Sequence, residues 1–213
     1  IQQFLFENRK NLLKQNILYP ETGIDSASHH LIPWVYTNDE RNRGGLTRQD
    51  IKQDLRREIE ARSGLEKVIV SSEGFVFGME PKSAREVFNH LFERITLIIY
   101  LRQPLRWIQS DYNQGVKGWR RLTCTYDEHL RQSLSAEYSP LDYESRVTAW
   151  ASEFGSDTVE IRSYDLEKSD LQGSFLRILG VENFPWLQSS ADDNVNPGLS
   201  ASQLELLRAI NSL

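Results

Sequence analysis

The stretch ITLIIYL (residues 95–101) decides the fold class, because it is an unbroken apolar run rich in β-branched residues. Such a run predicts a strand of a parallel sheet that helices cover on both faces. KVIVSS (67–72) before it and TVEIRSY (158–164) after it predict two further strands. Helical patterns separate the three strands, so we expect an α/β layer sandwich with right-handed crossovers.

Helices are expected between and beyond these strands. Thr47 with Asp50, and Ser200 with Gln203, have the spacing of capping boxes, which predicts a helix start at both places. Pro104 suits the first turn of the helix that follows the strand at 95–101. The other helical patterns cover residues 1–18, 51–63, 80–94, 126–134, 142–154, 165–180 and 201–212, whereas residues 20–46 have the glycine and proline content of a loop.

The composition is that of one folded domain, which we take to span residues 1–213. Hydrophobic residues make up 39% of the chain and charged residues 26%, and no apolar run approaches the roughly 18 residues of a membrane-spanning helix. The single cysteine, Cys124, excludes an intrachain disulfide framework and a multi-cysteine zinc cluster, and we expect it to be structural. A net charge of −5 argues against a nucleic-acid partner.

The charges are unevenly distributed along the chain. Residues 102–131 hold six basic and three acidic side chains, whereas residues 137–193 hold four basic and twelve acidic ones. A basic segment in an acidic protein indicates a local anion site. Two differently solvated faces would give the same pattern, and the charges alone favour that explanation.

The basic segment opens with RQPLRWIQS (102–110), at the carboxyl end of the strand at 95–101. Ligands of parallel α/β folds bind beyond this edge of the sheet. Arg102 leaves the strand there, and Ser110 lies about two turns into the next helix, so a guanidinium and a hydroxyl converge on a space that suits a phosphate. A strand-end arginine in an ordinary surface ion pair is the alternative.

The longer segment IYLRQPLRWIQSDYNQGVK (99–117) resembles the 3′-phosphate-binding segment of sulfotransferases, in which a strand and an Arg-x-Pro turn lead to a serine eight residues after the arginine. The similarity to bacterial members of this family extends over nearly the whole chain. It is weakest in 24–50 and 118–140, which we expect to be lid-like insertions. The other matching segments are IQQFLFENRKNLLKQNILYP (1–20), VIVSSEGF (68–75), LDYESRVTAWASEFGSDTVEIRSYD (141–165) and NPGLSASQLELLRAIN (196–211).

The resemblance implies a three-layer sandwich with a central parallel sheet, the P-loop NTPase-like fold of sulfotransferases. It implies transfer of a sulfuryl group from 3′-phosphoadenylyl sulfate (PAPS) to a hydroxyl or amine, with a carbohydrate or glycolipid as the expected acceptor. The donor's 3′-phosphate would bind Arg102 and Ser110, and no metal would be needed. The resemblance to bacterial members of the family suggests a cytoplasmic location. A signal or anchor upstream of Ile1 would not be visible in these 213 residues.

One part of the family pattern is missing from these 213 residues. The lysine-bearing loop that binds the 5′-phosphosulfate, and the strand before it, are expected immediately before Ile1. We therefore expect the N-terminal strand of the sheet to be absent from this chain. We also expect the chain by itself to bind the sulfonate donor poorly and to be inactive.

Three residues are candidates for the general base that removes the acceptor's proton. Glu73 ends the strand at 67–72 on the ligand edge, where partial burial would raise its pKa, and a capping carboxylate or an ion-pair partner is an equally good explanation. His29 and His30 precede an aromatic-rich loop, and either imidazole titrates near neutral pH. Neighbouring loop histidines are more often solvated bystanders, and adjacent histidines do not form a metal site together.

Beyond Ser110, four further residues are candidates for substrate binding: Gln114, Lys117, Trp119 and Arg120. Gln114 shares its helical face and Lys117 follows one turn later, although Lys117 could equally be a solvated helix end. Trp119 could stack on a sugar ring and Arg120 could hold an acidic group of the acceptor. A tryptophan buried as a lid anchor is an equal alternative for Trp119.

Two other functions compete with sulfuryl transfer. A small-molecule kinase with a P-loop-type fold would need a magnesium ligand near a strand end, and Glu73 could serve. A non-catalytic glycan-binding module could have kept the fold without the anion loop. The presence of Arg102 and Ser110 argues against such a module, whereas a natural chain that truly lacked the anion loop would favour it.

Overall fold

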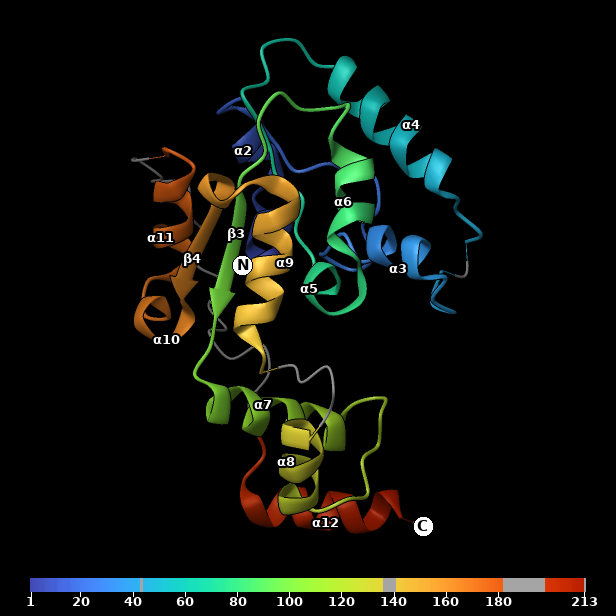
Figure 1. The fold of residues 1–213 in the computed structure, drawn as a ribbon, viewed down its shortest axis with the longest axis vertical. Helices are drawn as coiled ribbons and strands as arrows, with labels where there is room; N and C mark the ends of the chain where they lie inside the picture. Colours follow the sequence, from blue (N-terminus) through green and yellow to red (C-terminus); the bar gives the residue numbers. More distant parts are fainter. Residues whose placement is uncertain (43, 136–140, 182–197, 213) are drawn as a thin grey trace.

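A computed structural model of the chain describes residues 1–42, 44–135, 141–181 and 198–212. The protein is a mixed α/β fold that is mostly helical, with two small parallel sheets (Figure 1). The elements in chain order are α1 (Gln2–Glu7), α2 (Arg9–Leu13), β1 (Ile17–Leu18), α3 (Leu31–Thr37), α4 (Arg48–Glu60), β2 (Lys67–Val68), α5 (Gly74–Gly78), α6 (Pro81–Phe88), β3 (Leu97–Leu101), α7 (Pro104–Lys117), α8 (Tyr126–Ser135), α9 (Tyr143–Phe154), the 3₁₀ turn η1 (Ser156–Thr158), β4 (Val159–Ser163), α10 (Tyr164–Glu167), α11 (Leu171–Ile178) and α12 (Ala201–Asn211).

The strands form two parallel pairs. β3 and β4 run side by side in register, from Leu97 opposite Val159 to Leu101 opposite Ser163. β1 pairs with β2 over two residues each, and the extended chain continues to Ser72, because Ile69 N–H bonds to Leu18 and Ser71 C=O accepts from His29. The prediction of parallel strands separated by helices is confirmed, but the sequence did not indicate β1, whose two residues are too short to set a pattern.

The predicted starts of three helices, each marked in the sequence by a capping box or a proline, are confirmed. Thr47 and Asp50 form a reciprocal capping box at α4, and Ser200 and Gln203 do so at α12. Pro104 is the first residue of α7, since a proline in the first turn removes no intrahelical hydrogen bond. Local hydrogen bonds of this kind depend on residues three apart, so they are readable from the sequence.

Four predicted segments differ in the structure. The N-terminal helix is interrupted at the buried Asn8, whose amide Nδ2 bonds to the Phe4 carbonyl at 3.0 Å. The loop expected over 20–46 contains α3, since Pro33 lies in its first turn and does not break it. The helices expected over 80–94 and 165–180 are wrong in extent, because α6 ends at Phe88 and the second segment divides into α10 and α11.

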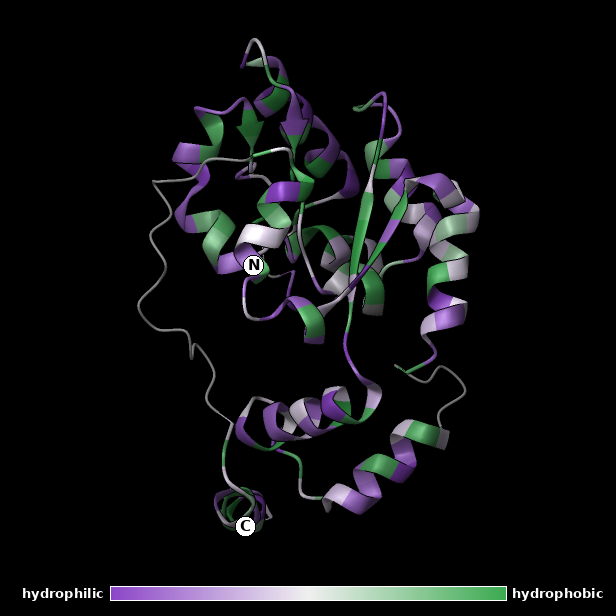
Figure 2. Cartoon of the chain, turned by 90° about the vertical axis from the view of Figure 1, so that its left-hand side faces the viewer, coloured by the Kyte–Doolittle hydropathy of each residue, from purple (hydrophilic) through white to green (hydrophobic). Residues whose placement is uncertain are grey.

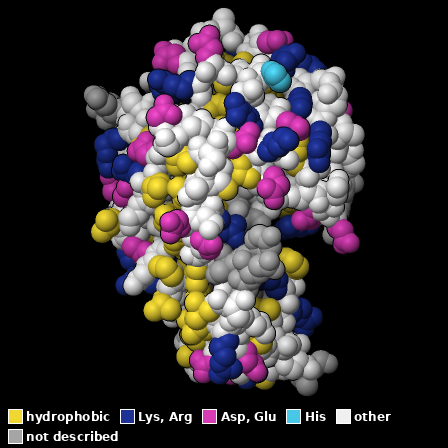
Figure 3. All heavy atoms as spheres, viewed as in Figure 1, with side chains coloured by type: hydrophobic (Ala, Val, Ile, Leu, Met, Phe, Trp, Pro, Cys, Tyr) yellow, Lys and Arg dark blue, Asp and Glu magenta, His cyan; other side chains and the backbone are white. Residues whose placement is uncertain are grey.

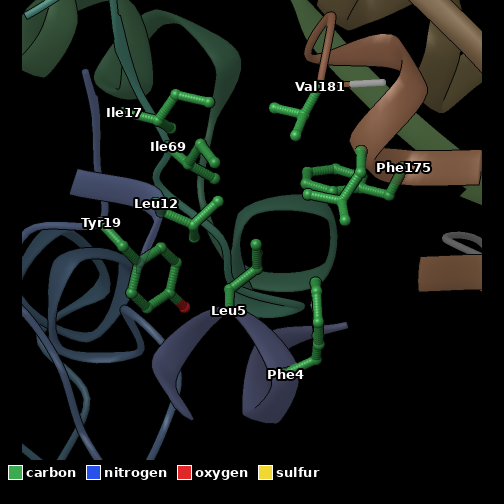
Figure 4. Close-up of a cluster of buried hydrophobic side chains, with 9 residues drawn as sticks. Phe4, Leu5, Leu12, Ile17, Tyr19, Ile69, Phe175 and Val181 are labelled. Atoms are coloured by element: carbon green, nitrogen blue, oxygen red, sulfur yellow. The ribbon is translucent and has the colours of Figure 1, made fainter. Parts of the chain in front are cut away.

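Two hydrophobic clusters lie on different sides of the extended segments. The first, which we call the α1/α11 core, includes Ile69 and is drawn in Figure 4. The second, the α4/α6/α9 core, has Val70 packed against it. Successive residues of one extended segment thus contact different clusters, as alternating side chains of a strand do. The α1/α11 core consists of Phe4, Leu5, Leu12, Ile17, Tyr19, Ile69, Phe175, Leu176 and Val181, and the α4/α6/α9 core of Ile32, Val35, Tyr36, Ile51, Leu55, Met79, Ala84, Val87 and Trp150.

Helices α7, α8 and α12 pack together at the end of the molecule towards which β3 points (Figure 1). The ring of Tyr112 in α7 contacts those of Tyr126 and His129, with centroids 5.5 Å apart in both cases. Asn211 of α12 bonds through Nδ2 to the backbone oxygen of Val116 at 2.8 Å. Among the described residues, no helix combines the length and apolar character needed to cross a bilayer.

Candidate functional site

The residues that follow the strands gather at one edge. Arg102 follows β3 directly and Tyr164 follows β4, and the two strands are parallel and in register up to Leu101 and Ser163. In Figure 1 the arrowheads of both strands point downwards, that of β3 towards α7 and that of β4 towards α10. The edge expected to bind a ligand therefore carries an arginine and a tyrosine side by side.

Arg102 is half-buried and has no counter-ion among the described residues. Its Cζ lies 5.1 Å from the centroid of the Tyr164 ring, which is within the range of a cation–π contact. Its Nε is buried and makes no hydrogen bond to any described residue. A buried donor without an acceptor costs about 1–3 kcal/mol. Within residues 1–42, 44–135, 141–181 and 198–212, Arg102 does not form the ordinary surface ion pair considered above.

The backbone on either side of Arg102 is fixed by residues remote in the sequence. The Tyr143 hydroxyl donates to the Arg102 carbonyl oxygen at 2.8 Å. The Asp165 carboxylate accepts from the Gln103 N–H at 2.7 Å. Burial raises the pKa of Tyr143, although the positive charge of Arg102 opposes the shift. The turn between β3 and α7 is thus held from α9 and α10.

Ser110 lies on the polar face of α7. The buried residues of this helix, Ile108, Tyr112, Gly115 and Val116, face α8 and α12. Ser110 is two positions after Ile108, about 200° around the helix, so it points away from α8 and α12. Gln114, which is exposed, and the half-buried Lys117 lie on the same face one and two turns later.

Arg102 and Ser110 are both half-buried, and neither belongs to a hydrophobic core. No hydrogen bond connects their side chains in the described structure. The two groups therefore do not satisfy each other. The structure brings Arg102 together with Tyr143, Tyr164 and Asp165, none of which the sequence pattern singled out.

Glu73 lies at the carboxyl end of the extended segment that continues β2, but it is exposed and makes no capping bond to α5. The expectation of partial burial is wrong, since this side chain is exposed, and so is the alternative of a capping carboxylate. Among the described residues Glu73 forms no ion pair either. Its charge nevertheless reaches two neighbours. It raises the pKa of His30 and that of the Ile1 amino group, against the larger opposite effect of burial in both cases.

His30 is half-buried beside Glu73. Its Nδ1 lies 2.7 Å from the Ser72 hydroxyl, which also accepts a hydrogen bond of 3.1 Å from Gly74 N–H. Its ring stacks on Trp34 with centroids 5.5 Å apart. Burial lowers the pKa of His30, so its ring is neutral at physiological pH and able to accept a proton. Of the two adjacent histidines, it is the one with the geometry of a base.

His29 is fully buried and held by the backbone. Its Nδ1 accepts from Ser71 N–H at 3.1 Å, and its Nε2 lies 3.0 Å from the Pro20 oxygen. Burial lowers the pKa of His29 to about 4. With both nitrogens occupied and no solvent contact, His29 ties the segment before α3 to the end of the β2 segment and has no free position for an acceptor.

Trp119 is 81% exposed, so it is not a lid anchor buried against the core. The guanidinium of Arg41 lies 4.6 Å from the ring centroid of Trp34 and 5.9 Å from that of Trp119, and it pairs with Asp39 at 2.6 Å. This group brings the segment after α3 next to the segment after α7. The sequence had placed Trp119 in a candidate site but not Trp34 or Arg41.

Arg120 is used within the fold. It forms an ion pair with Asp111 at 2.8 Å and also bonds to the Asp111 backbone oxygen. The same carboxylate lies 3.0 Å from Nε2 of His129. Arg120 therefore joins α7 to the following loop, and its guanidinium is not free to hold an acidic acceptor group as expected.

On the face drawn in Figure 3, basic and acidic side chains intermingle, and hydrophobic side chains continue down to the end formed by α7, α8 and α12. Within the described ranges, no three His, Cys, Asp or Glu side chains form a group that could hold a metal ion.

Comparisons with protein-family models, curated proteins and solved structures give no match.

Proposed function

We propose that this chain is the larger part of a PAPS-dependent sulfotransferase. The observation that carries the proposal is the guanidinium of Arg102 at the carboxyl end of β3, with a buried Nε that no described residue satisfies. A dianionic phosphate would remove that cost and add charge-assisted hydrogen bonds of about 1.5–3 kcal/mol each. The segment around Arg102 and Ser110 is also the one that resembles the 3′-phosphate site of the family.

The fold that we propose is the three-layer, P-loop NTPase-like sandwich. The two hydrophobic cores support it, because helices α1 and α11 contribute to one and helices α4, α6 and α9 to the other, with extended segments touching both. The parallel direction within each strand pair is consistent with this topology.

In the proposed reaction, an acceptor oxygen or nitrogen attacks the sulfur of the donor in line with the bridging phosphate oxygen. The bond from sulfur to that oxygen breaks, adenosine 3′,5′-bisphosphate leaves, and the acceptor's proton passes to a base. Arg102 and Ser110 would hold the 3′-phosphate and so position the donor. His30 and Glu73 are the candidate bases, and no metal is required by this chemistry.

For the acceptor we propose a carbohydrate or glycolipid. The exposed indole of Trp119 supports this, since flat apolar faces stack on sugar rings, and Trp34 and Arg41 extend the aromatic surface. Gln114 and Lys117 lie on the α7 face that carries Ser110, where they could contact either substrate.

Ligand preference tests this function against a kinase. Adenosine 3′,5′-bisphosphate, adenosine 5′-monophosphate and ATP with Mg²⁺ would be titrated into the 213-residue chain and followed by NMR chemical shifts. We expect the 3′,5′-bisphosphate to bind at least tenfold tighter than the monophosphate, with shifts centred on Arg102 and Ser110. Preferential binding of ATP with Mg²⁺ would replace the proposal with the kinase, and binding of glycans alone would replace it with a glycan-binding module.

A further inference from the structure

Two parts of the chain that are distant in sequence meet at Arg41. This residue belongs to the segment after α3, whereas Trp119 follows α7, which packs with α8 and α12. Figure 2 shows these three helices as a group below the strands, reached from β3 through a hydrophilic stretch of chain. The guanidinium of Arg41 lies within the range of a cation–π contact both to Trp34 of α3 and to Trp119. Two indoles and one guanidinium therefore join the two parts.

The backbone of Trp119 is fixed on both sides while its indole is left open. Before it, the N–H of Gly118 donates to the Gln114 carbonyl at 2.8 Å, at the end of α7. After it, Arg120 forms its ion pair with Asp111. The indole is nevertheless largely exposed, so its burial contributes little to folding. An aromatic ring that is both exposed and held in place is preorganised to contact a ligand.

Asp39 holds Arg41 in position and neutralises its charge. The Asp39 carboxylate accepts hydrogen bonds from Arg41 Nε at 2.8 Å, from Nη2 at 2.6 Å and from the backbone N–H at 2.9 Å. The N–H of Asp39 in turn donates to the Trp34 carbonyl at 2.9 Å. The hydrogen bonds from Arg41 lower the pKa of Asp39 to about 2, so the carboxylate is ionised at physiological pH. An acidic ligand would have to displace Asp39 from this fork, and the surface therefore favours an uncharged one.

His30, a candidate base, lies on the other side of Trp34 in this chain of contacts. Its ring stacks on Trp34, and it is connected to Trp119 only through Trp34 and Arg41 among the described residues. A single sugar ring covers about one indole face with its C–H groups. A sugar ring on Trp119 is thus separated from the base by two further groups. A ligand that reaches both ends of this row has more than one sugar unit.

We propose that Trp34, Arg41 and Trp119 form a subsite for an uncharged sugar unit of the acceptor, beside the unit that reacts at His30. The acceptor is then a neutral chain of several sugars, and neither a free monosaccharide nor an acidic glycan. This inference rests on the proposed function, because it specifies the acceptor of that reaction.

The binding of neutral sugars of increasing length tests the subsite without a sulfonate donor. Glucose, cellotriose and cellohexaose, and the matching series of N-acetylglucosamine oligomers, would be titrated into the isotope-labelled chain and followed by NMR shifts of the indole N–H groups. We expect a hexamer to bind about tenfold or more tighter than its monomer, with shifts at Trp34 and Trp119. Trp119→Ala should reduce the affinity for the hexamer to that for the monomer. Leu206→Ala, at an exposed apolar position of α12, is the control and should keep the dependence on length.

An acidic oligosaccharide tests the role of Asp39. Hexagalacturonate should bind the unsubstituted chain more weakly than the neutral hexamer, because it competes with Asp39 for Arg41. Asp39→Asn keeps the size of the side chain but leaves the charge of Arg41 without its counter-ion. This variant should bind hexagalacturonate about tenfold or more tighter than the unsubstituted chain does. Glu40→Gln makes the same change of net charge at the exposed neighbouring position, and it should have little effect.

Three results would overturn the proposal. One is equal affinity for monomer and hexamer in both series, or no binding of any of these sugars. The second is an unchanged dependence on length in Trp119→Ala, which would place the sugars elsewhere. The third is tighter binding of hexagalacturonate than of the neutral hexamer by the unsubstituted chain.

Titration of adenosine 3′,5′-bisphosphate into the same samples separates this subsite from the proposed function. If the nucleotide binds but affinity for sugars does not depend on length, the subsite alone is overturned. If affinity for sugars depends on length and on Trp119 but the nucleotide does not bind, the sugar site is supported and the enzymatic proposal is overturned.

Discussion

The hydroxyl of Tyr143, at the start of α9, donates a hydrogen bond of 2.8 Å to the backbone oxygen of Arg102, at the end of β3. The two residues are 41 positions apart. This bond fixes the point at which the chain leaves the strand, and with it the base of the Arg102 side chain. Precise placement of a guanidinium determines whether it can form two directional bonds to a phosphate.

Tyr143→Phe removes only that hydroxyl, so we expect it to lower the free energy of unfolding by about 1 kcal/mol. Urea denaturation followed by circular dichroism measures the change. Tyr126→Phe is the matched control, because the Tyr126 ring packs on Tyr112 while no described hydrogen bond uses its hydroxyl. Equal effects of the two substitutions would show that the bond to Arg102 has no particular role.

Asp165 makes the second remote bond to this turn, through a carboxylate that accepts from Gln103 N–H. Asp165→Ala should destabilise the protein by about 1 kcal/mol, since it removes a hydrogen bond to the exposed N–H of Gln103 at the start of α7, where water can take the place of the carboxylate. Asp165→Asn keeps an acceptor oxygen and should recover part of the loss. If both variants unfold at the same urea concentration as the unsubstituted chain, the carboxylate does not stabilise the turn through this bond.

Ser110→Ala tests the hydroxyl that we assign to the donor's 3′-phosphate. A hydrogen bond to a charged group contributes about 1.5–3 kcal/mol, so the affinity for adenosine 3′,5′-bisphosphate should fall about tenfold or more. Stability should not change, because Ser110 lies on the polar face of α7. Ser152→Ala, at an exposed position of α9, is the control and should leave affinity unchanged. Unaltered binding by Ser110→Ala would remove this residue from the site.

His29 should make stability depend on pH. Its pKa falls from 6.5 to about 4 on folding, so between these values the unfolded chain binds more protons than the folded one. Stability is therefore fully present above pH 6.5, and it falls as the pH decreases towards 4. We expect a loss of about 2 kcal/mol between pH 7.5 and pH 5, measured by urea denaturation.

The control for this prediction is His29→Gln, which cannot gain a proton. This variant should be less stable at pH 7.5, because it loses one of the two backbone bonds of the ring, but it should depend less on pH. A variant with the same dependence on pH as the natural chain would assign the titration to another group, with His30 as the first candidate, since burial also lowers its pKa.

Local signals in the sequence were sufficient for much of the fold. The capping boxes at Thr47 and Ser200 and the proline at the start of α7 each involve neighbouring residues, and all three helices begin where expected. β1 was not predictable, since two residues have no periodicity. α3 was missed because Pro33 suggested a break, although a proline in the first turn is compatible with a helix.

The candidate site was predictable only in part. Arg102 stands directly after a strong strand signal, so its position at the sheet edge followed from topology. Tyr143 and Asp165 reach it from 41 and 62 positions away, and no local pattern reveals such contacts. His29 and His30 are adjacent in sequence and alike in composition, yet one is buried and backbone-bonded while the other is half-exposed, a difference that only the tertiary structure defines.

The most direct test of the central claim is the affinity of the chain for adenosine 3′,5′-bisphosphate relative to adenosine 5′-monophosphate, before and after Arg102→Ala. The account predicts that the natural chain prefers the 3′,5′-bisphosphate at least tenfold, about 1.4 kcal/mol, and that Arg102→Ala abolishes the preference. Arg57→Ala, at an exposed ion pair of α4, should retain it. An unchanged preference in Arg102→Ala, or none in the natural chain, would contradict the assignment of Arg102 to the 3′-phosphate.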